Sequence, residues 1–300
     1  MKKLAYIFGA LMFLVPAVAG AQALPFTAVD SDAKSLSKAG ADLVETSAAA
    51  LPYSDAAFDA AVGYTMWQPT TANANIINVD AAYKMGEKFG LSLDLMYGMN
   101  PKYTITNSAG AASGEFAPSD MHVELGLGWK VLPFLSVGAE VGYATSSIAK
   151  DYSYGAVTAD VFLMTKINGF KAAAGISNLG SAVASKSGVK YSLPTAASVG
   201  LGYDMSFADV HAVAVTFDAD YYFKYGINLS LGAEYSYADM AFVRAGYNLS
   251  GEAVLPSYAS IGAGARFAGV EINLAYLIAS SAPLSIAAKN TLAIGLGYSF

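Results

Sequence analysis

The segment Asn290–Phe300 alternates strictly between two kinds of side chain. One parity holds large apolar or aromatic side chains, and the other holds Thr, Ala, Gly and Ser. In a β-strand successive side chains point to opposite faces of the sheet. This segment therefore predicts a strand with one apolar face and one small, polar face. Such a strand suits a sheet whose apolar face meets lipid rather than water.

The composition supports a membrane protein without membrane-spanning helices. The chain of 300 residues is 55% hydrophobic and only 13% charged, whereas average globular chains carry about 25% charged residues. Beyond residue 21 no uninterrupted apolar run reaches about 18 residues, the length needed for a transmembrane helix. The apolar side chains are therefore expected on strands.

Residues 1–21 have the features of a secretory signal peptide. Lys2 and Lys3 form the positive region, Leu4–Val18 form the apolar core, and Ala19-Gly20-Ala21 give a small-x-small cleavage site. The alternative, an uncleaved anchor, is disfavoured because the apolar core is short. We therefore expect an exported protein that begins near Gln22.

The charge and cysteine content exclude some classes of partner. The net charge is −6, and no basic cluster occurs, which argues against nucleic-acid binding. The chain has no cysteine. It therefore has neither disulfide bonds nor a lipoprotein anchor, and we expect its sheet to provide the stability.

Residues 22–56 differ from the remainder of the chain. They are rich in Ala, Ser and Asp and show no alternation, although Asp32–Val44 predicts one short helix. We interpret the segment as a periplasmic lead-in or a plug that turns into a barrel mouth. A disordered leader is the alternative interpretation.

Alternation begins at residue 57 and recurs to residue 300. It predicts fourteen strands, at 57–67, 75–85, 90–99, 120–131, 134–146, 156–167, 170–178, 195–205, 211–222, 227–237, 240–249, 258–268, 270–279 and 290–300. Each is about ten residues long, enough to cross a bilayer when tilted. The fold class expected is all-β: a transmembrane antiparallel β-barrel of 14 strands spanning 57–300, in the cell outer membrane and in contact with its lipid.

The connections between these strands sort by length. The connections that follow even-numbered strands are short, as periplasmic turns are in such barrels. Most of those that follow odd-numbered strands are long, at 100–119, 148–156, 181–194, 248–257 and 280–289. Outward-facing Tyr and Trp near the strand ends are typical of membrane interfaces.

Most charged residues on the predicted strands have the inward parity. A Lys or Arg facing lipid at mid-membrane costs about 2–4 kcal/mol, so exclusion from lipid explains most of them without any ligand. The candidates for a lumen function are Asp94, Glu124, Glu140, Asp218, Asp220, Glu234, Arg244 and Arg266.

No residue pattern predicts catalysis, a cofactor or a metal. The two histidines, His122 and His211, fall at different depths of the predicted barrel, and no G-x-G pair opens a helix after a strand. All four G-x-G pairs have the inward parity. We hypothesise that these glycines leave room for residues 22–56 in the lumen.

Several short motifs resemble a known family. Fourteen strands with an N-terminal segment resemble the FadL-like barrels. Within them, Asp32–Ala41, Gly175–Gly180, Phe242–Tyr247 and Gly295–Phe300 look like segments of the PorV/PorQ family of the type IX secretion system of Bacteroidetes. The ending with Tyr298 and Phe300 resembles the signal that is read by the barrel-assembly machinery, an expected partner.

The resemblance implies a function in protein transport. Members of this family bind the C-terminal domains of secreted cargo, or secretion-system subunits, and do not catalyse a reaction. The alternative is a FadL-like passive transporter of small hydrophobic compounds, which should show an apolar pocket and an inward kink in one strand. The polar, Gly-rich inward face favours partner binding. A general diffusion pore is disfavoured, since porins usually have sixteen or more strands.

Overall fold

The computed structural model describes residues 23–67, 73–150, 152–184, 188–224, 226–250, 257–279 and 288–300. The predicted signal peptide, 1–21, lies outside the described residues. So do Gln22 and parts of the predicted loops, namely 68–72, 151, 185–187, 225, 251–256 and 280–287.

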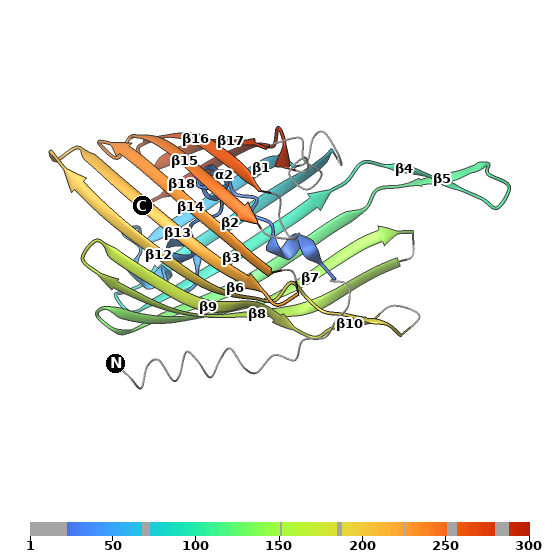
Figure 1. Ribbon diagram of the computed structural model, residues 1–300, viewed down its shortest axis with the longest axis horizontal. Helices are drawn as coiled ribbons and strands as arrows, with labels where there is room; N and C mark the ends of the chain where they lie inside the picture. The colour runs from blue at the N-terminus through green and yellow to red at the C-terminus, as the bar shows by residue number, and fades with distance from the viewer. Residues whose placement is uncertain are drawn as a thin grey trace.

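The described chain forms one closed antiparallel barrel (Figure 1), which confirms the predicted fold class. Its fourteen wall strands are β1 (Phe58–Trp67), β2 (Ala74–Met85), β3 (Phe89–Met99), β6 (Ser119–Leu132), β7 (Leu135–Ala149), β8 (Tyr152–Ile167), β9 (Phe170–Gly180), β12 (Ala196–Phe207), β13 (His211–Tyr222), β14 (Gly226–Tyr237), β15 (Ala241–Ser250), β16 (Tyr258–Phe267), β17 (Val270–Ile278) and β18 (Leu292–Ser299). Each wall strand pairs with its neighbour along the chain, and β1 pairs with β18 to close the ring.

Two of the expected loops contain strands of their own. The hairpin of β4 (Tyr103–Thr106) and β5 (Ala112–Phe116) lies within 100–119, and that of β10 (Val183–Ala184) and β11 (Lys190–Tyr191) lies within 181–194. The β4–β5 hairpin projects far beyond the wall (Figure 1). The sequence analysis missed both hairpins because each strand is too short for a clear alternation.

The outer surface of the wall is apolar. Every wall strand exposes large hydrophobic side chains on its outward parity, and Leu125 and Val243 are both 62% exposed. A surface of this kind is stable only against hydrocarbon, and a closed barrel leaves no backbone polar group unpaired there. The protein is therefore an outer-membrane barrel.

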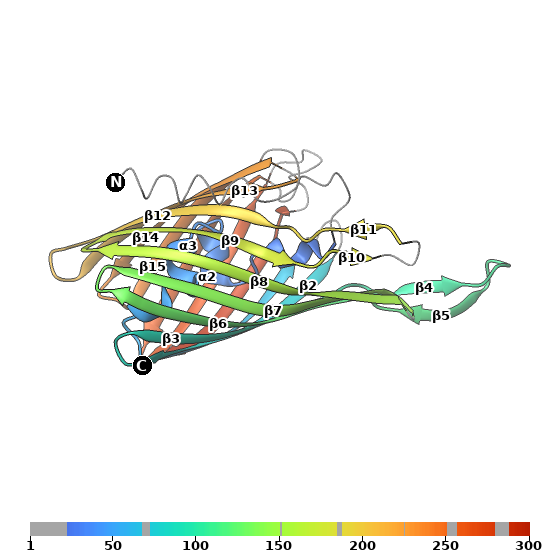
Figure 2. The same ribbon diagram turned by 90° about the horizontal axis from the view of Figure 1, so that it is seen from below.

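The two ends of the barrel differ. One end, here called the short-turn end, has tight connections such as Ala268-Gly269, whose φ angles are both positive (50° and 81°). The other, the long-loop end, carries the β4–β5 and β10–β11 hairpins. The C-terminus lies at the short-turn end, opposite to the β4–β5 hairpin (Figure 2). Tyr298 accordingly pairs with Val270 beside that turn.

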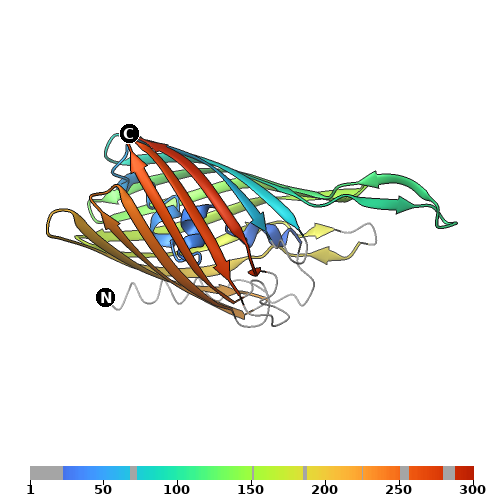
Figure 3. The ribbon, with the colours of Figure 1, turned by 90° about the horizontal axis from the view of Figure 1, so that it is seen from above.

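Residues 23–56, here called the plug, lie inside the barrel (Figures 2 and 3). They form η1 (Pro25–Ala28), α2 (Ala33–Ser37), α3 (Leu43–Thr46) and η2 (Leu51–Tyr53). None of the helices in the described ranges is long and apolar enough to cross a membrane. The plug begins at the long-loop end, where Ala23 N–H donates to Ser192 O at 2.9 Å. It continues into β1 at the short-turn end, so it runs the length of the lumen.

The single helix predicted over Asp32–Val44 is wrong. Asp32 caps α2, because its Oδ2 accepts the Ser35 N–H at 2.8 Å. The helix then stops at Ala39 and Gly40, which have left-handed φ angles of 58° and 73°. A Cβ atom on Gly40 would lie 2.2 Å from Asp30 Oδ2, so the plug folds back on itself there.

The Ala268-Gly269 turn predicts a stabilising substitution. A two-residue hairpin with positive φ at both positions favours Asn-Gly, whereas Ala is strained in the left-handed region by roughly 1–2 kcal/mol. We expect Ala268→Asn to raise the free energy of unfolding in detergent by about 1 kcal/mol, measured by urea titration. Ala117→Asn is the control, since Ala117 is exposed and has no positive φ. Equal effects of the two substitutions would contradict this account.

Candidate functional site

The inner wall is shaped to hold the plug. At six of the eight G-x-G glycines a Cβ atom would meet a plug residue, and those glycines are Gly126, Gly128, Gly200, Gly202, Gly262 and Gly295. At Gly128 the added atom would lie 2.1 Å from Ala48 O, and at Gly262 it would lie 2.2 Å from Ser37 Cβ. At Gly128 and Gly262 only glycine leaves the space that the plug occupies.

Wall side chains also hydrogen-bond the plug backbone. The plug has little regular structure of its own, so its buried N–H and C=O groups need partners from outside it. The wall supplies them through Asp218 Oδ2 to Asp42 N and Leu43 N (2.7 and 2.8 Å), Glu140 Oε1 to Ala48 N (2.6 Å), Ser136 Oγ to Ala49 O (2.6 Å), Thr65 Oγ1 to Ser31 O (2.7 Å) and Ser260 Oγ to Ser37 O (3.0 Å). These bonds fix the height and rotation of the plug.

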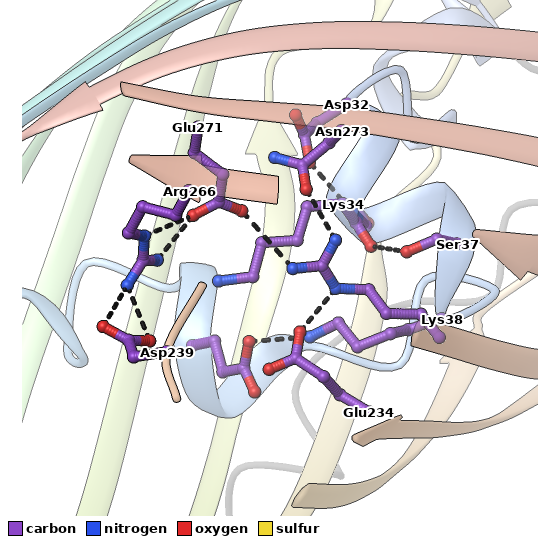
Figure 4. A network of polar contacts seen from close by, with 12 residues as sticks. Asp32, Lys34, Ser37, Lys38, Glu234, Asp239, Arg266, Glu271 and Asn273 are labelled. Atoms are coloured by element: carbon purple, nitrogen blue, oxygen red, sulfur yellow. Dashed lines mark hydrogen bonds and ion pairs between the residues drawn. The ribbon is translucent and has the colours of Figure 1, made fainter. Parts of the chain in front are cut away.

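A network of charges lies on one side of the lumen, on β14–β17 (Figure 4). The Arg244 side chain, which is 1% exposed, donates to Glu234 and to Asn273 Oδ1 (2.6 Å), and it forms an ion pair with Glu271 (3.4 Å). Arg266 pairs with Glu271 and with Asp239 (2.8 Å). Each cation of this network faces carboxylates, so neither arginine is left without an ion-pair partner.

The plug carries its own buried ion pair. Lys38 Nζ lies 2.6 Å from Glu45 Oε2, and the Lys38 side chain is only 3% exposed. Burial works against the charged form of Glu45, but the neighbouring lysines, Lys38 first among them, together outweigh it and lower the pKa of this carboxyl to about 2. The pair therefore stays charged at neutral pH and fastens the loop between α2 and α3.

The rest of the lumen, from β3 round the ring to β13, is acidic. A cavity of about 320 Å³ lies between the plug and the wall there, and we call it the acidic cavity. Eight carboxylates line it: Asp30, Asp42, Asp94, Glu124, Glu140, Asp160, Asp218 and Asp220. No Lys or Arg of the described ranges does so. Burial and the neighbouring carboxylates, Asp42 first among them, raise the pKa of Asp30 in the plug to about 8.

Strand register brings these carboxylates together. Asp80 lies opposite Asp94, Asp94 lies opposite Glu124, and Glu140 lies opposite Asp160 on neighbouring strands. Like charges in directly opposed positions destabilise a sheet. These opposed carboxylates therefore lower the stability of the barrel wall when no other group neutralises them.

A second cavity, of about 480 Å³, lies between the plug and β1, β2, β17 and β18. A hollow on the lipid side of the wall shares five lining residues with it: Ala61, Asp80, Ala81, Gly297 and Tyr298. Ala61 pairs directly with Gly297 across the β1–β18 seam. Because both side chains are minimal, the wall is thin at this point.

The eight predicted lumen candidates divide into two groups in space. Asp94, Glu124, Glu140, Asp218 and Asp220 line the acidic cavity, whereas Glu234, Arg244 and Arg266 form the charge network. The sequence analysis did not single out Asp160, or the plug residues Asp30 and Asp42. Nothing in the aperiodic plug sequence marks the latter two.

The histidines and the C-terminal aromatics occupy separate places. His122 Nε2 lies 3.0 Å from Thr158 Oγ1 and 3.9 Å from Glu124 Oε1, whereas His211 Nδ1 bonds the Tyr235 hydroxyl at 2.7 Å. The rings of Tyr298 and Phe300 lie 5.9 Å apart, and both are exposed on the outer face. The role of these two rings in assembly stays a prediction.

Comparison with known proteins gives a structural likeness only. No protein-family sequence model matches the chain, and no curated protein is similar to it in sequence. The structure is similar to the TodX deltaS2S3 mutant monoaromatic hydrocarbon channel, with a TM-score of 0.62, 12% identity, and coverage of 89% of this chain and 98% of that one. The fold of this protein is therefore that of the FadL-like barrels.

Two further solved structures have a similar fold. The toluene transporter TbuX of Ralstonia pickettii has a TM-score of 0.59 at 10% identity, covering 90% of this chain and 98% of that one. A FadL homologue of Pseudomonas aeruginosa has a TM-score of 0.55 at 11% identity, covering 91% and 99%. At these identities the likeness concerns the FadL-like fold alone.

The fit of the plug in this FadL-like barrel can be tested with a bulky residue. A Cβ atom on Gly138 would lie 2.2 Å from Ala49 N, so we expect Gly138→Val to displace the plug. A Ser47→Cys reporter is nearly isosteric, is 4% exposed at Ser47, and would be the only cysteine. We expect this thiol to resist alkylation in a barrel that is otherwise unchanged. When Gly138→Val is also present, the thiol should be alkylated readily. Gly114→Ala, which meets no atom within 4 Å, is the control and should leave the thiol protected.

The charge network predicts a large stability effect. Arg244→Met leaves the Glu234 carboxylate without its cation and Glu271 with Arg266 alone, and breaking a buried pair in this way costs about 3–5 kcal/mol. We expect a loss of that size in the free energy of unfolding, from urea titration in detergent. Lys102→Met is the control, because Lys102 and Glu115 are 72% and 66% exposed. A loss no larger than that of the control would show that the network adds nothing to stability.

Proposed function

We propose that the protein is a passive channel for small hydrophobic compounds and that the plug must move for transport. The three similar structures are named as a monoaromatic hydrocarbon channel, a toluene transporter and a FadL homologue. None of these is a PorV/PorQ protein or an enzyme. This proposal therefore prefers the alternative of the sequence analysis to cargo binding in type IX secretion.

The thin place in the wall is the observation that carries the proposal. The hollow on the lipid side is lined by apolar side chains such as Ala60, Val62 and Val79, and it borders the lumen cavity through Ala61 and Gly297. A hydrophobic compound gains free energy on leaving water for hydrocarbon. A route from the lumen to lipid through this wall would release such a compound without exposure to the aqueous side.

The plug also removes the main argument for cargo binding. The sequence analysis favoured a partner because the inward face is polar and rich in glycine. In the structure the glycines accommodate the plug, and Asp218 and Glu140 accept its N–H groups. The polarity of the inner wall therefore has a partner within the chain.

The experiment uses a disulfide that locks the plug. A Cβ atom on Gly295 would lie 3.5 Å from Ala33 Cβ, with no shorter contact, and Cβ atoms of disulfides lie about 3.5–4.5 Å apart. We expect cells with the parent barrel to take up labelled toluene faster than cells without it. The oxidised Ala33→Cys/Gly295→Cys variant should lose this gain and recover it when reduced.

Two outcomes would contradict parts of the proposal. Toluene uptake no faster than in cells without the barrel would contradict the transport function. Equal uptake by the oxidised and reduced variant would show that the plug need not move. Each single cysteine variant serves as a matched control for the disulfide. A separate variant, Gly297→Leu, fills the thin part of the wall and should slow toluene uptake under oxidising and reducing conditions alike. Copurification of exported proteins that share a C-terminal domain would favour cargo binding instead.

A further inference from the structure

Three carboxylates of the acidic cavity converge on one point. Glu124, Glu140 and Asp160 come from the adjacent strands β6, β7 and β8, and one oxygen atom of each lies within 4.8 Å of the others. Two of these side chains are held by backbone groups: Glu140 accepts the Ala48 N–H at 2.6 Å, and Asp160 accepts the Asn178 N–H at 2.8 Å. Their positions are therefore fixed in spite of their mutual repulsion.

A bulge in the wall orients one of the three. Ala159 pairs with Leu179 and Val161 pairs with Ile176, so two residues of β9 oppose Asp160. The bulged Asn178 has a left-handed φ of 54°. Bulges re-aim side chains beside functional sites in many sheets. Here the bulge on β9 points the backbone N–H of Asn178 at the Asp160 carboxylate on β8.

Among the described residues, buried acceptor oxygens without a partner occur both at the three-carboxylate cluster and elsewhere along the same cavity. Asp218 Oδ1 and Asn248 Oδ1 lack a hydrogen-bond partner among the described residues, although Asp218 is 2% exposed and Asn248 is 1% exposed. Glu124 Oε1 is unpartnered as well. All three atoms are acceptors, and such buried atoms are costly without a partner. The Ser47 hydroxyl, which also lines the cavity without a partner, can donate one hydrogen bond, so most of the unmet need is for donors or a cation.

No lysine or arginine of the described ranges lines this cavity. Arg244 and Arg266 are paired with carboxylates of the charge network, and Lys38 is paired with Glu45. Eight carboxylates consequently share a space of about 320 Å³ in which no described Lys or Arg takes part. A cation from solution would offset their repulsion.

We propose that Glu124, Glu140 and Asp160 bind a calcium ion in the lumen, bridging β6, β7 and β8 beside the plug. The three side chains offer only oxygen, and hard divalent cations prefer oxygen ligands. Calcium takes six to eight ligands in flexible geometry, and the cavity has room for water to complete the set. Magnesium demands stricter octahedral geometry and suits this open arrangement less well.

The ion would also stiffen the plug. Glu140 holds the Ala48 N–H, and Ala48 lies against Gly126 and Gly128 of β6. An ion bound to the Glu140 carboxylate would hold this side chain in place. Through the Ala48 N–H it would then also hold the segment of the plug between α3 and η2. This site goes beyond the proposed transport function and does not depend on which compound is carried.

The experiment is calcium titration of the full-length barrel, purified in detergent and stripped with a chelator. We expect saturable binding by calorimetry and a rise in the thermal unfolding temperature on addition of calcium. The test variant Glu124→Gln/Glu140→Gln/Asp160→Asn keeps the shape of the side chains and their acceptor oxygens. Removal of a group that only hydrogen-bonds a metal ligand weakens metal binding by about 10–100-fold, so loss of three charged ligands should lower the affinity by roughly 100-fold or more.

A second measurement separates this site from general charge effects. Without calcium, the test variant should unfold at a higher temperature than the parent, because three like charges are gone. The control Glu87→Gln/Glu115→Gln/Asp209→Asn removes as many charges from exposed positions and should bind calcium as the parent does. Absence of calcium binding to the parent would overturn the proposal. So would equal affinities of the parent and the test variant, or an equal loss in the control.

Discussion

The hydrogen-bonding requirement of the backbone in hydrocarbon is the constraint on which the rest of this structure depends. A strand that faces lipid cannot leave an edge, because an unpaired N–H or C=O there costs several kcal/mol. The β1–β18 ladder removes the last edge, from Asp59 opposite Ser299 to Met66 opposite Leu292. Closure in turn creates an interior that is cut off from lipid. Polar and charged side chains of every strand are directed into that interior.

The same requirement shapes the plug. Its helices are short, and its remaining backbone groups bond to wall side chains such as Ser136, Asp218 and Ser260. The wall in turn needs something to fill the space opposite its glycines. Plug and wall are therefore complementary, with a network of paired charges on one side of the lumen and an excess of carboxylates around the rest of it. The uneven distribution of charge across the lumen arises from the plug and the wall together and cannot be seen in any one strand.

Side-chain parity could be predicted from the sequence, whereas three-dimensional proximity could not. β17 was expected at 270–279 and is found at Val270–Ile278, because its apolar residues alternate without a break. The opposition of Asp94 and Glu124 depends on register across the β4–β5 hairpin, which alternation does not specify. The plug has no period, since α2 and α3 are shorter than two helical turns. Its contacts, and with them Asp30 and Asp42, emerge only when the wall surrounds it.

The course of the plug through the lumen has a consequence for the order of assembly. Ala23 lies at the long-loop end, and the opposite end of the plug is covalently continuous with β1 at the short-turn end. A chain that passes through a closed ring must either be threaded afterwards or be enclosed as the ring forms, and threading is very rare in protein folds. We therefore expect the fourteen strands to curl around a segment that is already in place. The pairing of β1 with β18 is then the event that makes its enclosure permanent.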